Sequence, residues 1–521
     1  MQWDQAAAVA GEIAAAWTGE GGPGGAVLLF DADGIRAEAC GGRASLEQTG
    51  DFTADTTVRY ASISKHFLCA LLAATGAIGF DDRLGADLEL TPALAALPVG
   101  RALDMTAGIP DAMETLWLLG VPPTATIGQP ALRRFVGGFA ALNFPPGSEI
   151  SYSNSGYRLV QSALAAKGID YAQALAEQFL DPLGLAIRLP YDETDPVAGL
   201  SRGYWRGPLG WQHGRYGLHY SASGGLAGSA RDLATWLRAL LAGRGALAGV
   251  LARLTAPRPL VDGRMTDYGL GLAASPMPGM KVVGHGGSLP GFKNHFLLAP
   301  DLGVGVIVVS NREDTDAHGA ALRVMAALGG VELAPPLTAA LPDGLFVADR
   351  GPYWMEHAAG RVDYLGASDT LFPGADGIAR SRSAHLPMRL RAEDGAIAGE
   401  IGHAPRRFLP VAPGLSAPPA WAGRWAAEAQ DARFEIAVAN GAAQFTIGTG
   451  PLRSTMRLTP LTADRALLEG DGDGPWRQRV CLQFDGDIVR LVTNRSRVLV
   501  FQRNRSHTGS AGVVGAEAVR S

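Results

Sequence analysis

Two residues that could act together in hydrolysis, a serine and a lysine, stand three positions apart in the segment SISK at 62–65. On a helix this spacing puts Ser62 and Lys65 on one face, within reach of each other. Ser62 lies at the helix N-terminus, where the dipole favours developing negative charge, and desolvation of Lys65 one turn inside would lower the pKa of its amine. An amine without its proton can accept the serine proton, so the pair predicts a nucleophile with its base. The plain alternative is a serine cap followed by an exposed lysine.

A phenol and an amide occur in a second segment, YSN at 152–154, between the turn FPPG at 144–147 and a following helix. A tyrosine close to two cations can be partly ionised and act as a general base, which is the role that we expect for Tyr152. Asn154 would orient Lys65 or a substrate amide. Taken alone, a buried structural tyrosine would be the better interpretation of this segment.

A third segment, HGG at 285–287, lies on a strand expected to start at Met280. The two glycines after His285 would let a substrate backbone approach the edge of the strand. We expect His285 to hold the Tyr152 hydroxyl by a hydrogen bond and to help polarise it. Each segment singly is common, but the three together, in this order, predict one site.

The composition limits the classes of protein that are compatible with the chain. It has 521 residues, with 45 Lys+Arg against 50 Asp+Glu, so it lacks the basic surface of a nucleic-acid-binding protein. No stretch approaches about 18 consecutive apolar residues, so we expect no transmembrane helix and no membrane partner. The cysteines, Cys40, Cys69 and Cys481, are odd in number and far apart, so no disulfide framework or metal spacing is predicted. We expect no metal and no cofactor. The N-terminus lacks a basic region typical of a secretory signal, and we expect a cytoplasmic protein.

Lysine is rare in this chain. Of the 45 basic residues, 41 are arginines and four are lysines: Lys65, Lys167, Lys281 and Lys293. Arginine cannot lose its proton in a protein, whereas a buried lysine can. Only Lys65 has a role that the sequence supports.

The first 330 residues are predicted to form an α+β domain. An apolar run at 25–30, a DADG turn and a second run to 44 indicate a β-hairpin. Helical periodicity predicts helices over 4–17, 65–75, 156–167, 171–180, 230–242 and 317–328, and short apolar runs predict strands over 281–286, 293–299 and 303–310.

The remainder of the chain is predicted to be all-β. Short alternating segments with turn signals recur after the proline-rich linker at 331–343, and again after a second linker at 416–420. Strands of similar length at regular spacing indicate two antiparallel barrels, which we assign to residues 338–414 and 421–507. Residues 508–521 are predicted to be a disordered tail.

Together, the three segments resemble the penicillin-recognising serine hydrolases, which include class C β-lactamases, D,D-peptidases and serine D-aminopeptidases. The resemblance covers residues of about 20–330 and includes the segments MTAGIPD at 105–111 and GGLAG at 224–228. The third segment begins with His285 rather than lysine, which makes an ordinary β-lactamase a poorer match. A β-lactamase/D,D-peptidase-like domain followed by two all-β domains resembles the bacterial serine D-aminopeptidases. That resemblance implies two eight-stranded lipocalin-like barrels, an intracellular location, and release of small D-amino acids such as D-alanine from peptides and amides.

The resemblance also implies a mechanism. Ser62 would attack the carbonyl after passing its proton to Lys65 or Tyr152, and water would resolve the acyl-enzyme. The sequence leaves open which of the two is the base. The backbone N–H groups of Ser62 and Ser288 would form the oxyanion hole. The residues expected to contact substrate are Asn154, Gly286, Gly287 and Ser288.

An aminopeptidase must also recognise a free ammonium group, and a buried cation needs an acidic partner. The segment EGDGDGP at 469–475 in the last β region offers Asp471 or Asp473, if this loop reaches the catalytic cleft. A solvated hairpin turn is the plain alternative. A calcium loop counted from Asp471 would need Glu at its twelfth position, where Leu482 stands, so that reading fails.

Two other functions stay open at this point. One is a D,D-peptidase or esterase of the same fold, and the other is an inactive homologue used for binding or sensing. The expected partner is a small peptide or amino-acid amide. A homodimer is one assembly that we consider.

Overall fold

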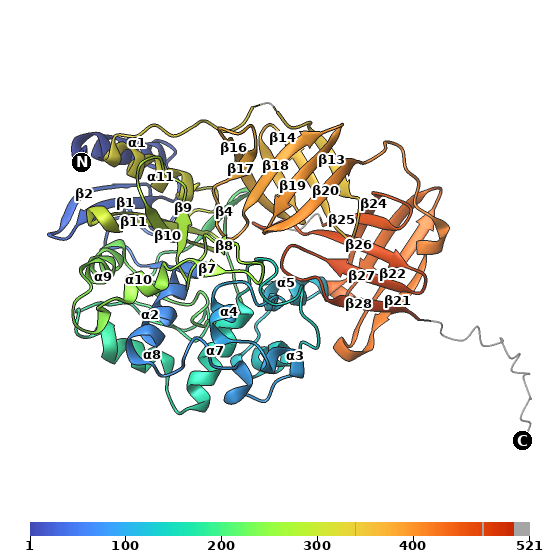
Figure 1. Ribbon diagram of the computed structural model, residues 1–521, viewed down its shortest axis with the longest axis horizontal. Helices are drawn as coiled ribbons and strands as arrows, with labels where there is room; N and C mark the ends of the chain where they lie inside the picture. The colour runs from blue at the N-terminus through green and yellow to red at the C-terminus, as the bar shows by residue number, and fades with distance from the viewer. Residues whose placement is uncertain (339, 471–473, 505–521) are drawn as a thin grey trace, which may run out of the picture.

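The computed structural model describes residues 1–338, 340–470 and 474–504. The described chain forms an N-terminal α+β unit, seen from blue to olive in Figure 1, and two β-barrels in orange and red. This order confirms the predicted fold class. The tail predicted at 508–521 lies outside the described residues.

The α+β unit is built on an antiparallel sheet that the described residues form in the order β2-β1-β12-β11-β10-β9. Its strands are β1 (Gly25–Asp31), β2 (Ile35–Gly41), β9 (Ala273–Ser275), β10 (Val282–Leu289), β11 (Phe292–Ala299) and β12 (Val304–Ser310). The N-terminal hairpin pairs with the last strand of the unit, Gly25 opposite Ser310. The first and last segments of the unit are therefore joined in one sheet.

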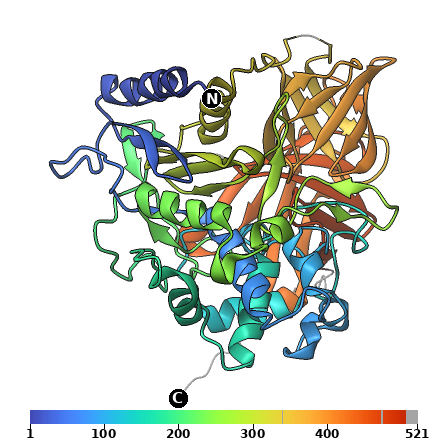
Figure 2. The ribbon, with the colours of Figure 1, turned by 60° about the vertical axis from the view of Figure 1, so that its left-hand side comes forward.

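Both faces of this sheet are covered, which explains the unbroken apolar run of β1. Because side chains alternate along a strand, Val27 and Leu29 pack on one face with α1 (Trp3–Gly19) and α11 (Ala317–Gly329). Leu28 and Phe30 pack on the other face with the larger helical cluster. Figure 2 shows dark-blue α1 and olive α11 above the sheet, with the green and blue helices below it.

Helix α2 (Lys65–Thr75) runs through the centre of the helical cluster, and its residues from Lys65 to Ala73 are all buried. It ends where the sequence predicted, because Gly76 adopts a left-handed φ of 66° and returns its N–H to Leu72. The other helices are α3 (Pro92–Ala95), α4 (Val99–Leu103), α5 (Ala112–Leu118), α6 (Gln129–Gly137), α7 (Ser155–Ala166), α8 (Tyr171–Leu175), α9 (Ala230–Ala242) and α10 (Val250–Leu254). Short strand pairs join β3 (Val58–Arg59) to β6 (Ala227–Gly228), β4 (Tyr204–Gly207) to β5 (Gly210–His213), and β7 (Arg258–Pro259) to β8 (Met265–Thr266).

Each barrel is a closed antiparallel sheet of eight strands within the described ranges. The first comprises β13 (Gly344–Ala348), β14 (Trp354–Ala358), β15 (Arg361–Tyr364), β16 (Ala367–Pro373), β17 (Ala379–Ser381), β18 (Met388–Glu393), β19 (Ala396–Ile401) and β20 (Ala404–Pro410). The second comprises β21 (Gly423–Ala427), β22 (Ala432–Ala439), β23 (Ala442–Ile447), β24 (Ser454–Pro460), β25 (Arg465–Glu469), β26 (Arg479–Asp485), β27 (Ile488–Val492) and β28 (Leu499–Arg503). Large side chains such as Trp425, Phe434 and Phe445 fill the second barrel. Its interior is therefore a packed core.

Apolar contacts join the three units. Leu467 and Val492 of the second barrel pack into the core of the first, and Leu118 of α5 packs into the core of the second. This packing brings the loops of both barrels against the α+β unit. Among the described residues, none of the helices has the length and apolar character needed to span a membrane.

Candidate active site

Ser62 lies in a single 3₁₀ turn, Ala61–Ser64, between β3 and α2. The preceding residue, Ala61, has a φ of 52°, which is unusual for a residue with a Cβ and needs support from its surroundings. The buried side chains of Tyr220 and Leu289 pack against Ala61 and supply that support. Ser62 remains partly exposed while both of its neighbours are buried. The turn therefore leaves the Ser62 side chain accessible at the head of a buried helix.

Lys65 is fully buried at the first position of α2. Its Nζ donates to Ser62 Oγ at 3.2 Å, to Asn154 Oδ1 at 2.7 Å and to the backbone oxygen of Ser223 at 2.5 Å. Burial lowers the pKa of the Lys65 amine well below its ordinary value, and the Asp111 carboxylate only partly opposes this. The amine next to Ser62 is thus biased towards its neutral, proton-accepting form.

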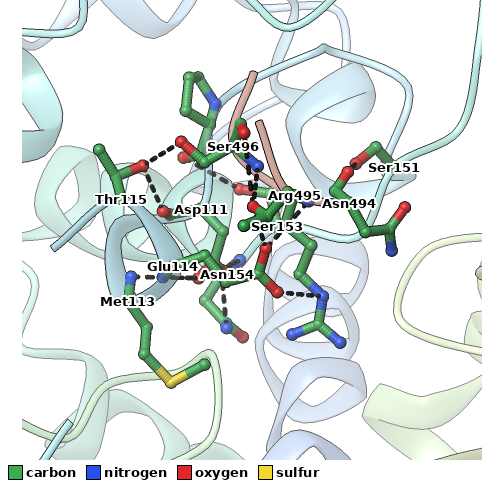
Figure 3. Close-up of polar contacts among 12 residues, drawn as sticks. Asp111, Met113, Glu114, Thr115, Ser151, Ser153, Asn154, Asn494, Arg495 and Ser496 are labelled. Carbon is green, nitrogen blue, oxygen red and sulfur yellow. Dashed lines mark hydrogen bonds and ion pairs between the residues drawn. The ribbon is translucent and has the colours of Figure 1, made fainter. Parts of the chain in front are cut away.

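Asp111 fixes the orientation of Asn154 (Figure 3). It is the N-cap of α5, with Oδ1 accepting from the N–H groups of Met113 and Glu114, both at 3.1 Å. Its Oδ2 accepts from Asn154 N at 2.8 Å and from Asn154 Nδ2 at 2.9 Å. Because the amide nitrogen is held by this carboxylate, the amide oxygen of Asn154 is turned towards Lys65.

Tyr152 is buried between two cations. The Lys65 Nζ and the Arg495 Cζ each lie 4.7 Å from its ring centroid, and the His385 ring meets it edge-on at 5.3 Å. Among the described residues, its hydroxyl has no hydrogen-bond partner of ordinary geometry. Ser62 is nevertheless close enough to lower the pKa of the phenol. Burial raises the pKa of Tyr152, more than Ser62 and Arg495 lower it. A neutral phenol therefore lies beside the serine.

The predicted hydrogen bond from His285 to Tyr152 is wrong. The His285 Nε2 is 2.9 Å from the Tyr268 hydroxyl, and Nδ1 is 2.6 Å from the backbone oxygen of Gly286, so both ring nitrogens are engaged elsewhere. The rings of His285 and Tyr152 lie 6.3 Å apart between centroids. Burial lowers the pKa of His285 well below its usual value, so a neutral imidazole forms this side of the site.

The two glycines after His285 lie where neighbouring segments pass very close to β10. A Cβ on Gly287 would lie 2.0 Å from the backbone oxygen of Tyr60, and one on Gly286 would lie 2.8 Å from His295 Nδ1. Gly287 therefore allows β10 to pass directly against the segment that carries the nucleophile. This contact sets the spacing between Ser62 and the following residue of β10, Ser288.

Lys293 belongs to a series of polar contacts that the sequence did not indicate. Its Nζ donates to Ser288 Oγ at 2.7 Å and forms an ion pair of 2.7 Å with Glu313 Oε1. The same Glu313 oxygen accepts from Trp476 Nε1 at 3.1 Å. Trp476 precedes β26 of the second barrel, so Glu313 links that barrel to Lys293 on the hairpin β10–β11. Asp471 and Asp473, the predicted amine-binding residues, lie outside the described residues.

The loop between β27 and β28 docks on the start of α5 (Figure 3). The Asp111 N–H donates to Arg495 O at 2.9 Å, and the Arg495 N–H donates to Glu114 Oε2 at 3.0 Å. Glu114 Oε2 also accepts from Thr493 Oγ1 at 2.6 Å. The second barrel is therefore fixed to Asp111, the residue that holds Asn154.

The first barrel reaches the same place through His385, in the loop between β17 and β18. Desolvation by the surrounding protein lowers the pKa of the imidazole to about 3, and the Arg495 guanidinium adds to this. Both barrels thus place a nitrogen-bearing side chain beside Tyr152.

The structure gathers the predicted residues Ser62, Lys65, Tyr152, Asn154, His285, Gly286, Gly287 and Ser288 around the head of α2 and the strand β10. Sequence reasoning missed Asp111, although a Pro-Asp pair before a helix is an N-cap signal. It also missed His385 and Arg495, for which no local pattern exists. Within the described ranges, no group of three or more His, Cys, Asp or Glu side chains could hold a metal ion.

Comparison with known proteins identifies the family. A family model described as beta-lactamase matches residues 9–330, which is more than half of the chain. The chain belongs to the beta-lactamase family. The matched region contains the 62–65, 152–154 and 285–287 segments and ends before the first barrel.

Curated relatives of this chain are named D-aminopeptidase. The D-aminopeptidase of Gluconobacter oxydans is 29% identical over 333 residues, which is 62% of each chain. A D-aminopeptidase of Cereibacter sphaeroides is 26% identical over 494 residues, covering 88% of this chain and 91% of the relative. The second match is longer than the 322 residues that the family model covers.

Solved structures show the same fold. The octameric penicillin-binding protein homologue from Pyrococcus abyssi aligns with a TM-score of 0.55 at 17% identity, over 96% of this chain and 100% of that chain. The D-amino acid amidase from Ochrobactrum anthropi SV3 aligns with a TM-score of 0.52 at 20% identity, over 62% of this chain and 99% of the amidase. At these identities the likeness concerns the fold.

Proposed function

We propose that this protein is a serine hydrolase that releases N-terminal D-amino acids, small ones such as D-alanine, from peptides and amides. The observation that carries the chemistry is the buried Lys65 amine at 3.2 Å from Ser62 Oγ. The stereochemistry rests on relatives named D-aminopeptidase, one of which aligns over nearly the whole chain.

Acylation begins with attack of Ser62 Oγ on the substrate carbonyl. We assign the base to Lys65 rather than to Tyr152, because burial lowers the pKa of the amine and raises that of the phenol. The proton then returns through Lys65 and the Tyr152 hydroxyl to the leaving nitrogen. Water enters after the leaving group and releases the D-amino acid by the reverse transfers. Asn154 keeps the amine aligned, and the neutral His285 with Tyr268 forms the opposite wall.

The oxyanion would be held by the backbone N–H groups of Ser62 and Ser288. The close contact of Gly287 with the nucleophile segment supports this assignment, because it sets how near β10 lies to Ser62. Gly286 and Gly287 leave no side chain on β10 where a substrate backbone would lie.

The free ammonium of the substrate would be recognised by Asp471 or Asp473. The hydrogen bond from Trp476 to Glu313 supports this role, since Glu313 in turn pairs with Lys293 on the hairpin that carries Ser288. A carboxylate there would neutralise a buried amine.

We further propose that residues 1–330 act as the catalytic domain, with residues 338–414 and 421–507 as the two barrel domains. A cytoplasmic location and a homodimer remain predictions.

Substrate comparison tests the proposal. We expect D-alanyl p-nitroanilide to be turned over much faster than its L-isomer, its N-acetylated form, nitrocefin or p-nitrophenyl butyrate. Faster turnover of nitrocefin or of the butyrate ester would refute the aminopeptidase assignment in favour of a D,D-peptidase or esterase. Ser62→Ala should abolish both turnover and labelling by a serine-reactive fluorophosphonate. An unlabelled wild-type protein would indicate a binding or sensor homologue.

A further inference from the structure

Two side chains from different barrels, Arg495 and His385, meet at the Tyr152 ring. The guanidinium of Arg495 lies 4.7 Å from the ring centroid, and the His385 ring lies edge-on at 5.3 Å. Neither residue belongs to the part of the chain matched by the family model. The mechanism described above uses neither of them.

The backbone and the inner nitrogen of Arg495 are held in place. Its N–H and its carbonyl oxygen bond to Glu114 and Asp111, and its Nε lies 3.5 Å from Glu114 Oε1. The two terminal nitrogens have no hydrogen-bond partner among the residues that the structure describes. Figure 3 shows them turned away from the Glu114–Asp111 network. A pre-oriented guanidinium with two free N–H-bearing nitrogens matches the planar geometry of a carboxylate.

The position of Arg495 relative to the reaction follows from Tyr152. The Tyr152 hydroxyl lies beside Ser62, and the leaving nitrogen must take its proton from this side of the serine. Atoms bonded to the leaving nitrogen therefore extend along the Tyr152 ring. In a dipeptide, the free carboxylate is the group attached to the next α-carbon. It would lie closest to the residues that line the ring.

We propose that Arg495, with His385 beside it, forms a carboxylate subsite on the leaving-group side of Tyr152. The subsite makes dipeptides with a free C-terminal carboxylate better substrates than the corresponding dipeptide amides. It rests on the proposed aminopeptidase function and specifies the class of substrate. The terminal nitrogens of Arg495 form the paired contacts, and His385 contributes one weaker contact from the first barrel.

Kinetics with matched substrates test the subsite. For wild type, we expect kcat/KM for D-Ala-L-Ala to exceed that for D-Ala-L-Ala amide by about tenfold or more, as a charge-assisted pair should. Arg495→Met should lower kcat/KM for the acid by about tenfold to a hundredfold, and for the amide by less than about threefold. Arg495→Lys should keep part of the preference. Arg497→Met is the control for the loop, because Arg497 pairs with Glu149 instead, and it should leave the acid-to-amide ratio unchanged. Equal losses for acid and amide in Arg495→Met, or no preference in wild type, would overturn the subsite.

A second measurement does not depend on turnover. L-Alanine, the leaving group of the dipeptide, should slow fluorophosphonate labelling of Ser62 in wild type but not in Arg495→Met, whereas L-alaninamide should slow it in neither. Labelling of the variant without competitor shows that its site is folded. Wild type that cleaves no D-alanyl substrate refutes the proposed function. If L-alanine does not slow the labelling of wild type, the subsite is refuted.

Discussion

Substitution of Gly287 by alanine tests whether the close contact between β10 and the nucleophile segment sets the geometry of the site. The added Cβ would lie 2.0 Å from the Tyr60 oxygen and 3.2 Å from the Ala61 Cβ, whereas ordinary contact begins near 3.4 Å. The strand would have to move away by about 1.4 Å, and a misplacement of about 1 Å at a reacting centre costs roughly a hundredfold in rate. Overpacking of this kind also costs about 1–3 kcal/mol of stability. We expect kcat/KM of Gly287→Ala to fall by about two orders of magnitude.

The assay is turnover of D-alanyl p-nitroanilide together with the rate of fluorophosphonate labelling, which isolates acylation at Ser62. Gly224→Ala is the matched control, since its Cβ would lie at an ordinary 3.5 Å from the Ala61 carbonyl carbon. We expect this variant to keep kcat/KM within about threefold and stability within about 1 kcal/mol. A folded Gly287→Ala protein with wild-type labelling would refute the reasoning. So would an equal loss in both variants, because the effect would then not depend on the Tyr60 contact.

Three further predictions concern the surroundings of the site. Trp476→Phe removes the hydrogen bond to Glu313. We expect KM for D-alanyl p-nitroanilide to rise about tenfold with little change in kcat. An unchanged KM in steady-state kinetics would contradict this prediction. Asp111→Asn removes the anion that raises the pKa of Lys65, so the acid limb of the pH profile of kcat/KM should move to lower pH. A shift to higher pH, or no shift, would contradict the assignment of Lys65 as the base. Burial lowers the pKa of His66 to about 3 from its ordinary 6.5, so its stabilising effect is complete above pH 6.5 and is lost as the pH falls towards 3. At about pH 5 the loss is about 2 kcal/mol, and His66→Gln should reduce the drop in unfolding free energy between about pH 7.5 and pH 5 by that amount in chemical denaturation. An unchanged drop would show that His66 is accessible to protons in the folded state.

Local patterns predicted much of the architecture because they report local physics. The spacing of Ser62 and Lys65 is a property of one helical turn, and their contact follows from it. The alternation of apolar and polar residues along β22 is typical of a strand with one face in a barrel core, and the burial of its side chains alternates accordingly. The Gly76 stop of α2 likewise depends on a single left-handed residue.

Contacts between distant segments could not be predicted in this way. The sequence around His285 does not indicate that Tyr268 is its hydrogen-bond partner, because the packing of a separate segment brings Tyr268 to it. Arg495 is one of many arginines, and only the docking of a barrel loop on α5 makes it different. The close contact of Gly287 with Tyr60 could not be predicted either, since it depends on which backbone passes across β10.

The second barrel is part of the chemistry as well as of the fold. Arg495 carries a permanent positive charge to the Tyr152 ring, whereas the low pKa of Lys65 comes chiefly from its burial. The same loop bonds to Asp111, which orients Asn154 against the Lys65 amine. The Lys65 amine is therefore aligned through contacts made by a segment more than 400 residues away along the chain. A base that depends on such a segment is complete only when the barrel is docked, which couples the assembly of the whole chain to the reactivity of its serine.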